Sequence, residues 1–151
     1  MPKKAAGILL YRLKNKTLEV LLVHPGGPFW MKKDLASWSI PKGELNDDED
    51  LLEGAKREFH EEMGTPIDGD FIALTPAKGS NKTLYTFALE HDFDVSTIKS
   101  NMFSLEWPPK SGKTKEFPEI DRGEWFDYET ALTKINKYQV SILEELRKKV
   151  K

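Results

Sequence analysis

Hydrophobic and polar residues alternate along the chain in blocks that predict several strands. Residues 5–13 and 17–25 are apolar and rich in strand-forming side chains, and the polar tripeptide KNK separates them, so we expect a β-hairpin. Residues 26–37 are rich in glycine, proline and lysine, which is typical of a loop. A short strand is expected over residues 38–44, ended by Pro41, because proline lacks the amide hydrogen that a central strand uses.

The strongest helical pattern lies within residues 48–63. Asp47 or Asp48 is expected to cap this helix, acidic residues crowd its first turn, and Gly64 is expected to end it. Apolar residues at helical spacing give the helix one face that can pack on a sheet. This stripe consists of Leu51, Leu52, Ala55, Phe59 and Met63.

The rest of the chain continues to alternate between strands and helices. The expected elements are strands at 70–79 and 82–93, a long polar loop at 106–121, a strand and a helix start at 122–135, and an amphipathic helix at 138–151. No internal repeat or low-complexity tract interrupts this order. The pattern predicts one domain over residues 1–151, of the α/β or α+β class, with a mixed sheet.

Composition excludes some classes of function. The 151 residues suit one ordinary domain, and the net charge of -2 predicts neither a nucleic-acid nor a membrane partner. The absence of cysteine excludes disulfides and thiolate catalysis, so a metal here would be bound through oxygen or imidazole. The apolar run before Arg12 is too short for a membrane span or a signal peptide. We therefore expect a cytoplasmic protein, either a monomer or a homodimer.

Three glutamates fall together on the predicted helix. Glu58 precedes Glu61 by three residues and Glu62 by four, so at ~100° per residue all three project into one sector beside the apolar stripe. Like charges at this spacing destabilise a bare helix. A bound Mg²⁺ or Mn²⁺ would reverse that effect, because hard cations favour carboxylate oxygens. Arg57, four residues before Glu61, is expected to orient a carboxylate. Taken alone, the run also suits a solvated helix face with ion pairs.

The spacing around these glutamates matches a known pattern. A glycine is followed after five residues by a glutamate, and after seven more by Arg-Glu-apolar-x-Glu-Glu-x-Gly. This stretch resembles the Nudix box and departs from it only at the last position, where Thr65 replaces an aliphatic residue. The segment 38–43, Trp-Ser-Ile-Pro-Lys-Gly, is also similar to the entry to the box in dinucleoside polyphosphate hydrolases. The matching box residues are Gly43, Glu49, Arg57, Glu58, Phe59, Glu61, Glu62 and Gly64.

Resemblance to Nudix hydrolases implies an α/β/α sandwich around a mixed sheet and a metal-dependent cleavage of a diphosphate bond. In that family the metal, Mg²⁺ or Mn²⁺, is held by box glutamates and by a backbone carbonyl before the box glycine. Arg57 then orients a glutamate, Glu49 helps to hold the loop and helix together, and Gly43 lets the loop turn tightly. The implied metal ligands are Glu58, Glu61, Glu62 and the carbonyl of Lys42.

The general base and the substrate contacts are less defined. The base is either a box glutamate or an acidic residue of the late loop, where Glu119 and Glu116 are favoured over Asp121 without a way to choose between them. Lys42 and Gly43 are expected to meet the substrate, with Lys42 pointing a cation at phosphate.

The remaining aromatic and histidine residues carry weaker signals. Trp30 is a candidate for stacking on a base, against the equal alternative of an ordinary exposed loop. Trp38 and Trp125 are expected in the core, and His60 is expected to face solvent because it lies about 100° or more around the helix from the carboxylates. No role is evident for His24.

Two classes of function follow. The first is a pyrophosphohydrolase acting on a small-molecule nucleotide, either a dinucleoside polyphosphate or a nucleoside triphosphate. The alternative is a non-catalytic Nudix-like module that binds a nucleotide, or a hydrolase of another nucleoside diphosphate derivative such as ADP-ribose. The presence of all the box glutamates favours an enzyme. Nothing in the sequence specifies which residue is the general base or which nucleotide is the substrate.

Overall fold

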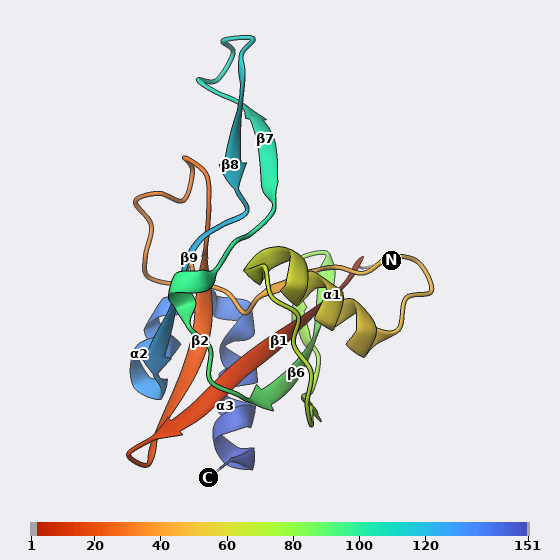
Figure 1. Cartoon of the computed structure of the whole chain (residues 1–151), viewed down its shortest axis with the longest axis vertical. Coiled ribbons are helices and arrows are strands. Elements are labelled where there is room, and N and C mark those ends of the chain that lie inside the picture. Colours follow the sequence, from red (N-terminus) through yellow and green to blue (C-terminus); the bar gives the residue numbers. More distant parts are fainter. Residues whose placement is uncertain (1–2, 151) are drawn as a thin grey trace.

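The N-terminal hairpin lies at the centre of a mixed sheet, as Figure 1 shows. In the computed structural model, which describes residues 3–150, β1 (Lys3–Lys14) pairs antiparallel with β2 (Thr17–Pro25) and parallel with β6 (Lys82–Glu90). On the other side of β2, β9 (Ile120–Asp127) pairs antiparallel with it. Three short strands extend the sheet along β1 and β6: β3 (Lys42–Glu44), β4 (Ile72–Ala73) and β5 (Ala77–Gly79).

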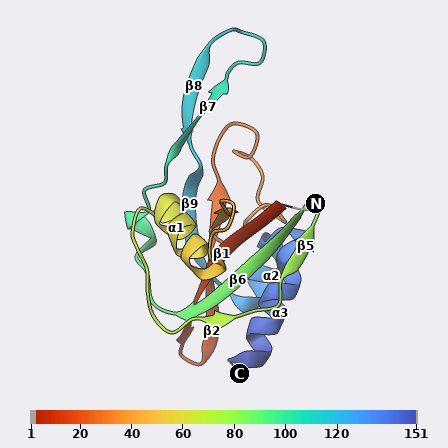
Figure 2. The same cartoon turned by 90° about the vertical axis from the view of Figure 1, so that its right-hand side faces the viewer.

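Helices cover both faces of this sheet (Figure 2). The helix α1 (Leu51–Met63) lies on one face, and α2 (Tyr128–Lys134) and α3 (Val140–Lys149) lie on the other. Two short 3₁₀ turns, η1 (Val95–Thr97) and η2 (Lys137–Gln139), follow β6 and α2. This is the α/β/α sandwich around a mixed sheet that the sequence predicts.

Strand periodicity explains why two separate cores form. Successive side chains of a strand point to opposite faces, so neighbouring apolar residues of β1 enter different layers. Ile8 and Leu10 pack with Phe59 of α1, whereas Leu9 packs with Leu143 of α3. All five side chains are buried. The continuous apolar run of β1 is therefore typical of a strand that is covered on both faces.

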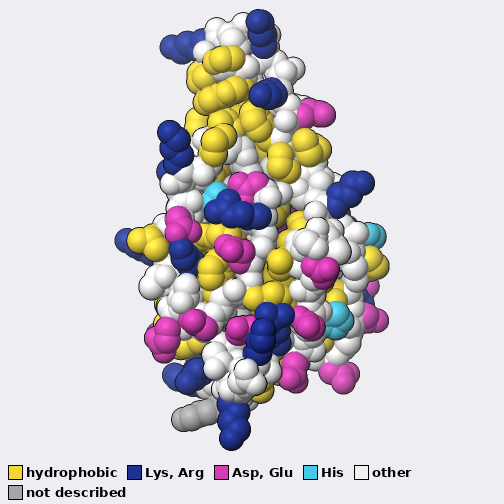
Figure 3. All heavy atoms as spheres, turned by 60° about the vertical axis from the view of Figure 1, so that its left-hand side comes forward, with side chains coloured by type: hydrophobic (Ala, Val, Ile, Leu, Met, Phe, Trp, Pro, Cys, Tyr) yellow, Lys and Arg dark blue, Asp and Glu magenta, His cyan; other side chains and the backbone are white. Residues whose placement is uncertain are grey.

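The segment 106–121 is a loop only over residues 107–113, so the prediction of one long loop is wrong for the residues on either side. It contributes to a second, two-stranded sheet of β7 (Met102–Glu106) and β8 (Thr114–Pro118), which projects from the domain (Figure 1). Phe103 and Phe117 pair across it with their ring centroids 6.1 Å apart. In β8 the three residues before Phe117 are threonine, lysine and glutamate, so this strand has no apolar alternation that the sequence would show. Figure 3 shows apolar side chains along this projection and basic ones near its end.

The segment that leads into α1 also differs from expectation. Pro41 does not end a strand but precedes β3, and its carbonyl accepts a hydrogen bond from the Ile8 amide at 3.1 Å. The cap of α1 is Asp50 rather than Asp47 or Asp48, because Asp50 accepts from the Glu53 amide at 3.0 Å. Gly64 caps the end of the helix, as predicted. It adopts the left-handed conformation that glycine tolerates.

The expected strands at 70–79 and 82–93 are also shorter than predicted. The first divides into β4 and β5, and the second ends with β6 at Glu90. None of the helices in residues 3–150 has the length and apolar character that a membrane span requires.

Candidate functional site

Glu58 is positioned by close contact between α1 and β3. A Cβ atom on Gly43 would lie 1.5 Å from Oε1 of Glu58, so any other residue at that position would displace the carboxylate or the strand. Burial raises the pKa of Glu58, although its ion pair with Arg57 opposes that effect. Gly43 therefore serves this site by leaving room for a charged side chain against the backbone.

Arg57 gathers three glutamates around one guanidinium. Its Nε and Nη2 donate to both carboxylate oxygens of Glu49 at 2.8 and 3.0 Å. Its Nη1 donates to one oxygen of Glu58 at 2.5 Å and one oxygen of Glu61 at 2.6 Å, while Nη2 also donates to the Glu44 carbonyl at 3.1 Å. The bidentate pair with Arg57 lowers the pKa of Glu49 to about 2. The predicted orienting role of Arg57 agrees with this geometry.

Glu62 is the buried member of the acidic group. Its side chain has a relative exposure of 8% and accepts a hydrogen bond from the Lys42 amide at 3.1 Å. Burial raises the pKa of Glu62 to about 8, with further contributions from the charges of Glu58 and Glu119, while Lys42 acts in the opposite direction. Few groups offset the cost of burying a negative charge on Glu62, so a cation bound beside this carboxylate would stabilise it.

Glu119 reaches the same place from the other end of the chain. A cavity of about 100 Å³ is lined by Lys42, Glu62 and Glu119. The Gly26 amide donates to the Glu119 carbonyl at 2.9 Å, which ties the β2–loop junction to this segment. At the rim of the cavity, partial burial and repulsion from Glu61 raise the pKa of Glu119. Glu119 is thus the distant carboxylate that the structure brings to the box glutamates.

A register shift separates Glu119 from the other two candidates. His24 pairs with Arg122 but Pro25 pairs with Ile120, so Asp121 is an extra residue in β9. Residues two apart in a regular strand share a face, but here the carboxylate of Asp121 turns to His24 instead. The third candidate, Glu116, is exposed on β8 opposite Ser104 and does not line the cavity.

His24 is the residue of this region that the sequence did not reveal. Its ring is fully buried, with Nε2 donating to the Lys33 carbonyl at 2.7 Å and Nδ1 lying 3.0 Å from Asp121. It therefore joins β9 to the loop 26–37. That loop is also held at its far end, where Asp34 accepts from Trp38 Nε1 at 2.8 Å. A histidine in a buried strand beside a bulge gives no signal in sequence without the strand pairing.

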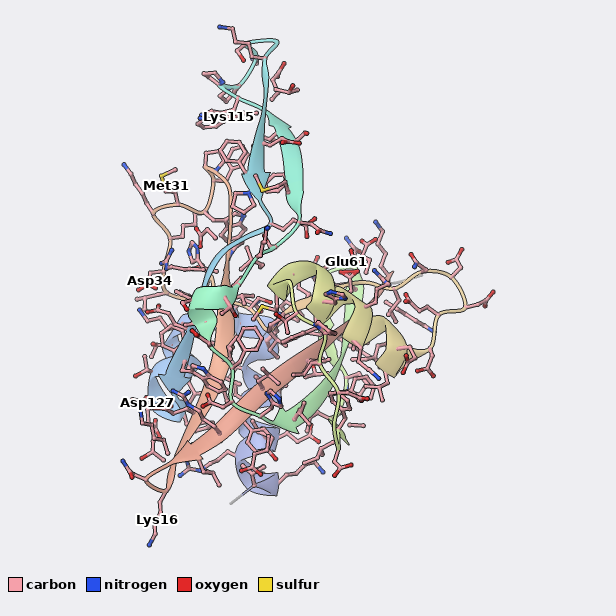
Figure 4. The ribbon with its side chains drawn as sticks, in the orientation of Figure 1. Lys16, Met31, Asp34, Glu61, Lys115 and Asp127 are labelled. Carbon is pink, nitrogen blue, oxygen red and sulfur yellow. The ribbon has the colours of Figure 1, made fainter. Side chains whose placement is uncertain are left out.

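The structure also gives the positions of the aromatic and histidine residues that the sequence singled out. Trp38 is buried and Trp125 packs at the edge of the core, so the core assignments are confirmed. His60 is exposed, as expected for its side of the helix. Trp30 lies in the loop 26–37 and lines a second cavity together with Lys42. Figure 4 shows that Met31, the next residue, extends away from the domain.

The donor set suits a hard divalent cation, although it is not assembled for one. Within residues 3–150 no three acidic, histidine or cysteine side chains are grouped in a way that would hold a metal. In this arrangement Glu58 and Glu61 each direct one oxygen to Arg57. Their other oxygens accept no hydrogen bond within the described chain, and Figure 4 shows Glu61 at the end of α1 that lies towards the projecting hairpin. The residues therefore fit Mg²⁺ or Mn²⁺ if these two carboxylates turn towards Glu62.

Comparison with known proteins agrees with this description. The model of the family described as "NUDIX domain" matches residues 1–146. Nudix hydrolase 7 of Arabidopsis thaliana is 28% identical over 113 residues; the match covers 69% of this chain and 38% of that protein. The matched region thus spans well under half the length of this relative.

Solved structures share the fold at low sequence identity. A Caenorhabditis elegans Ap4A hydrolase in a binary complex superposes with a TM-score of 0.64 at 21% identity, covering 98% of this chain and 97% of that one. The NUDIX domain of Shewanella oneidensis NrtR, solved with ADP ribose, gives a TM-score of 0.66 at 14% identity, covering 100% and 90%.

Proposed function

Since the chain belongs to the NUDIX domain family, we propose that its acidic cavity hydrolyses a diphosphate bond of a nucleotide with the help of Mg²⁺ or Mn²⁺. The favoured substrates are dinucleoside polyphosphates and nucleoside triphosphates. The observation that carries the proposal is the meeting of buried Glu62 with Glu119 and Lys42 in one cavity, beside Glu58 and Glu61. Such an excess of carboxylate is unfavourable unless a proton or a cation neutralises it.

Three roles are proposed for the residues of the site: metal binding, attraction of phosphate and proton transfer. Glu58, Glu61 and Glu62, with the Lys42 carbonyl, would hold the ion, which neutralises phosphate charge and acidifies a bound water. The Lys42 ammonium would attract the phosphate chain. Glu119 stands across the cavity from α1, and its raised pKa suits a group that takes a proton from water. We therefore propose Glu119, rather than Glu116, as the general base.

The first test is a panel of diphosphate compounds assayed with Mg²⁺ and with EDTA. It comprises nucleoside triphosphates, diadenosine polyphosphates, ADP-ribose and diphosphoinositol polyphosphates, with the products separated by chromatography. We expect turnover of a nucleotide and its loss in EDTA, with recovery when Mg²⁺ or Mn²⁺ is restored. Binding of a nucleotide without turnover of any compound would instead identify a non-catalytic module.

Metal binding should also depend on pH through Glu62. Because burial raises the pKa of Glu62 from the usual 4.5 to about 8, the folded state binds this proton more tightly than the unfolded chain. Without metal, the stability that Glu62 contributes is complete below pH 4.5 and is lost as the pH rises towards 8. Mg²⁺ must displace the same proton, so its affinity should fall by up to about tenfold per pH unit below 8.

Thermal melts with titrated Mg²⁺ at pH 6, 7 and 8 measure this coupling. We expect Mg²⁺ to raise Tm more at pH 8 than at pH 6, and Glu62→Gln to remove most of that difference. An equal rise at both pH values in the unaltered protein would exclude Glu62 as a metal ligand that titrates in this range.

A further inference from the structure

A second cavity adjoins the acidic one. It has a volume of about 290 Å³, and Trp30, Lys82, Asn136 and Tyr138 line it together with Lys42. We call it the Trp30 cavity. Lys42 lines both cavities, as do Pro25 and Ser39, so the two cavities adjoin. The Trp30 cavity therefore lies next to the place where the proposed phosphates would meet Glu62 and Glu119.

The walls of the Trp30 cavity are held in place by buried contacts. Gln139 is fully buried, accepts from the Ile40 amide at 3.0 Å and donates to Ser39 Oγ and to the Tyr138 hydroxyl at 3.0 and 3.1 Å. The Tyr138 ring lies against Gly79, where a Cβ atom would be 3.0 Å from the ring. The cavity is thus formed before any ligand binds, which lowers the cost of binding.

The chemistry of the lining suits a flat, polar heterocycle attached to phosphate. Trp30 provides an indole that is 39% exposed, with the ammonium of Lys33 at 5.0 Å from the ring. Stacking on such a ring is available to every nucleobase. Lys42 and Lys82 form no ion pair with a carboxylate within residues 3–150, and the Lys82 ammonium lies 5.3 Å from the Tyr138 ring centroid. Two such lysines favour an anionic ligand.

Asn136 supplies a hydrogen-bonding group that the fold itself does not use. Its Oδ1 is buried and has no donor within the described chain, and its Nδ2 makes only a 3.3 Å bond to the Trp38 carbonyl. An unsatisfied buried acceptor costs about 1–3 kcal/mol. A small rotation of this weakly held amide into the cavity would let Oδ1 accept from an N–H group of a ligand and remove that cost.

We propose that the Trp30 cavity binds the nucleobase of the substrate, stacked on Trp30 and hydrogen-bonded to Asn136, with the phosphates directed past Lys42 to the acidic group. This assignment rests on the proposed function, since it takes the phosphate end of the substrate to lie at Glu62. It adds a recognition site, formed by the loop 26–37 and η2, to residues that act on phosphate alone.

Binding of nucleoside monophosphates tests the proposal without any hydrolysis, because they contain no diphosphate bond. AMP, GMP, CMP and UMP are titrated in Mg²⁺ by calorimetry, with ribose 5-phosphate as the ligand that lacks a base. We expect at least one nucleotide to bind about tenfold or more tightly than ribose 5-phosphate. Trp30→Leu should bring that nucleotide close to the affinity of ribose 5-phosphate, and Asn136→Ala should weaken it about 3–10-fold.

The matched control is Asn46→Ala, which removes an exposed asparagine that lines neither cavity and should leave all affinities unchanged. Thermal melts establish that each variant is folded, and Trp30→Leu alters only an exposed loop. If no nucleotide binds better than ribose 5-phosphate, or if both cavity variants bind like the unaltered protein, the proposal fails even where hydrolysis is found. Base-dependent binding without hydrolysis of any compound would support this cavity and refute the proposed activity.

Discussion

Glu62→Gln is expected to lower kcat by about 10²–10³-fold while the protein stays folded. A bound cation contributes several kcal/mol of transition-state stabilisation, and each 1.36 kcal/mol is about tenfold in rate, so losing one anionic ligand removes much of that effect. The amide oxygen of glutamine still accepts from the Lys42 amide, which donates to Glu62 at 3.1 Å. Steady-state kinetics at saturating Mg²⁺, together with a Mg²⁺ titration, measure the loss.

The matched control for this variant is Glu53→Gln on the same helix. Glu53 is exposed and, within residues 3–150, its only ion pair is with Lys56 at 3.4 Å, so the same chemical change there should leave kcat within about twofold. Without metal at neutral pH, Glu62→Gln should not lower Tm, because Glu62 with a pKa of about 8 is already largely uncharged. Turnover near that of the unaltered protein would remove Glu62 from the metal site.

The part of this site that lies on α1 can be predicted from the sequence, because helix geometry fixes the relative positions of its side chains. Glu61 and Glu62 follow Glu58 after three and four residues. Residues at these spacings share one face of any α-helix, independently of the tertiary structure around it. The bond from Arg57 to Glu61 follows from the same spacing. Predictions that depend on one turn of helix therefore needed no tertiary structure.

The distant part of the site depends on strand pairing, which the sequence does not specify. Glu119 reaches Glu62 only because β9 pairs with β2, and the shift between His24 and Pro25 decides that Asp121 turns to His24. The sequence at 116–121 offers three carboxylates and favours Glu119 and Glu116 without a way to choose between these two. A one-residue change of register alone would reassign them, since it reverses which face each side chain enters.

The polar sequence of the projecting hairpin, β7 and β8, was predicted to be a loop for a related reason. A two-stranded ribbon that stands clear of the core needs few apolar residues, so its strand character lies in pairs such as Phe103 with Phe117 across the turn. The Trp30 cavity was also hidden, because Trp30 and Asn136 are far apart in sequence and meet only in the fold. From the sequence around Trp30 alone, a residue that stacks on a base and an ordinary loop residue are equally good interpretations.

Arg57→Ala is expected to reduce kcat by about 10–100-fold and to destabilise the fold by about 2 kcal/mol. Arg57 holds one oxygen of Glu58 and one of Glu61 while it is anchored on Glu49. It therefore fixes the direction of the oxygens that remain for a cation. Without it, the carboxylates repel one another and their side chains lose a common orientation. The loss of stability is limited because the arginine side chain is 31% exposed, so solvent screens its ion pairs.

Metal affinity distinguishes positioning from simple stabilisation in this variant. If Arg57 orients Glu58 and Glu61, the Mg²⁺ concentration for half-maximal rate should rise in Arg57→Ala and recover only partly in Arg57→Lys, which keeps the charge but not the bidentate pair with Glu49. Lys56→Ala is the control, because its exposed pairs with Glu53 and Asp68 are long and weak. A lower Tm with unchanged Mg²⁺ dependence would mean that Arg57 only stabilises the helix. Tighter Mg²⁺ binding would mean that it competes with the metal for these carboxylates.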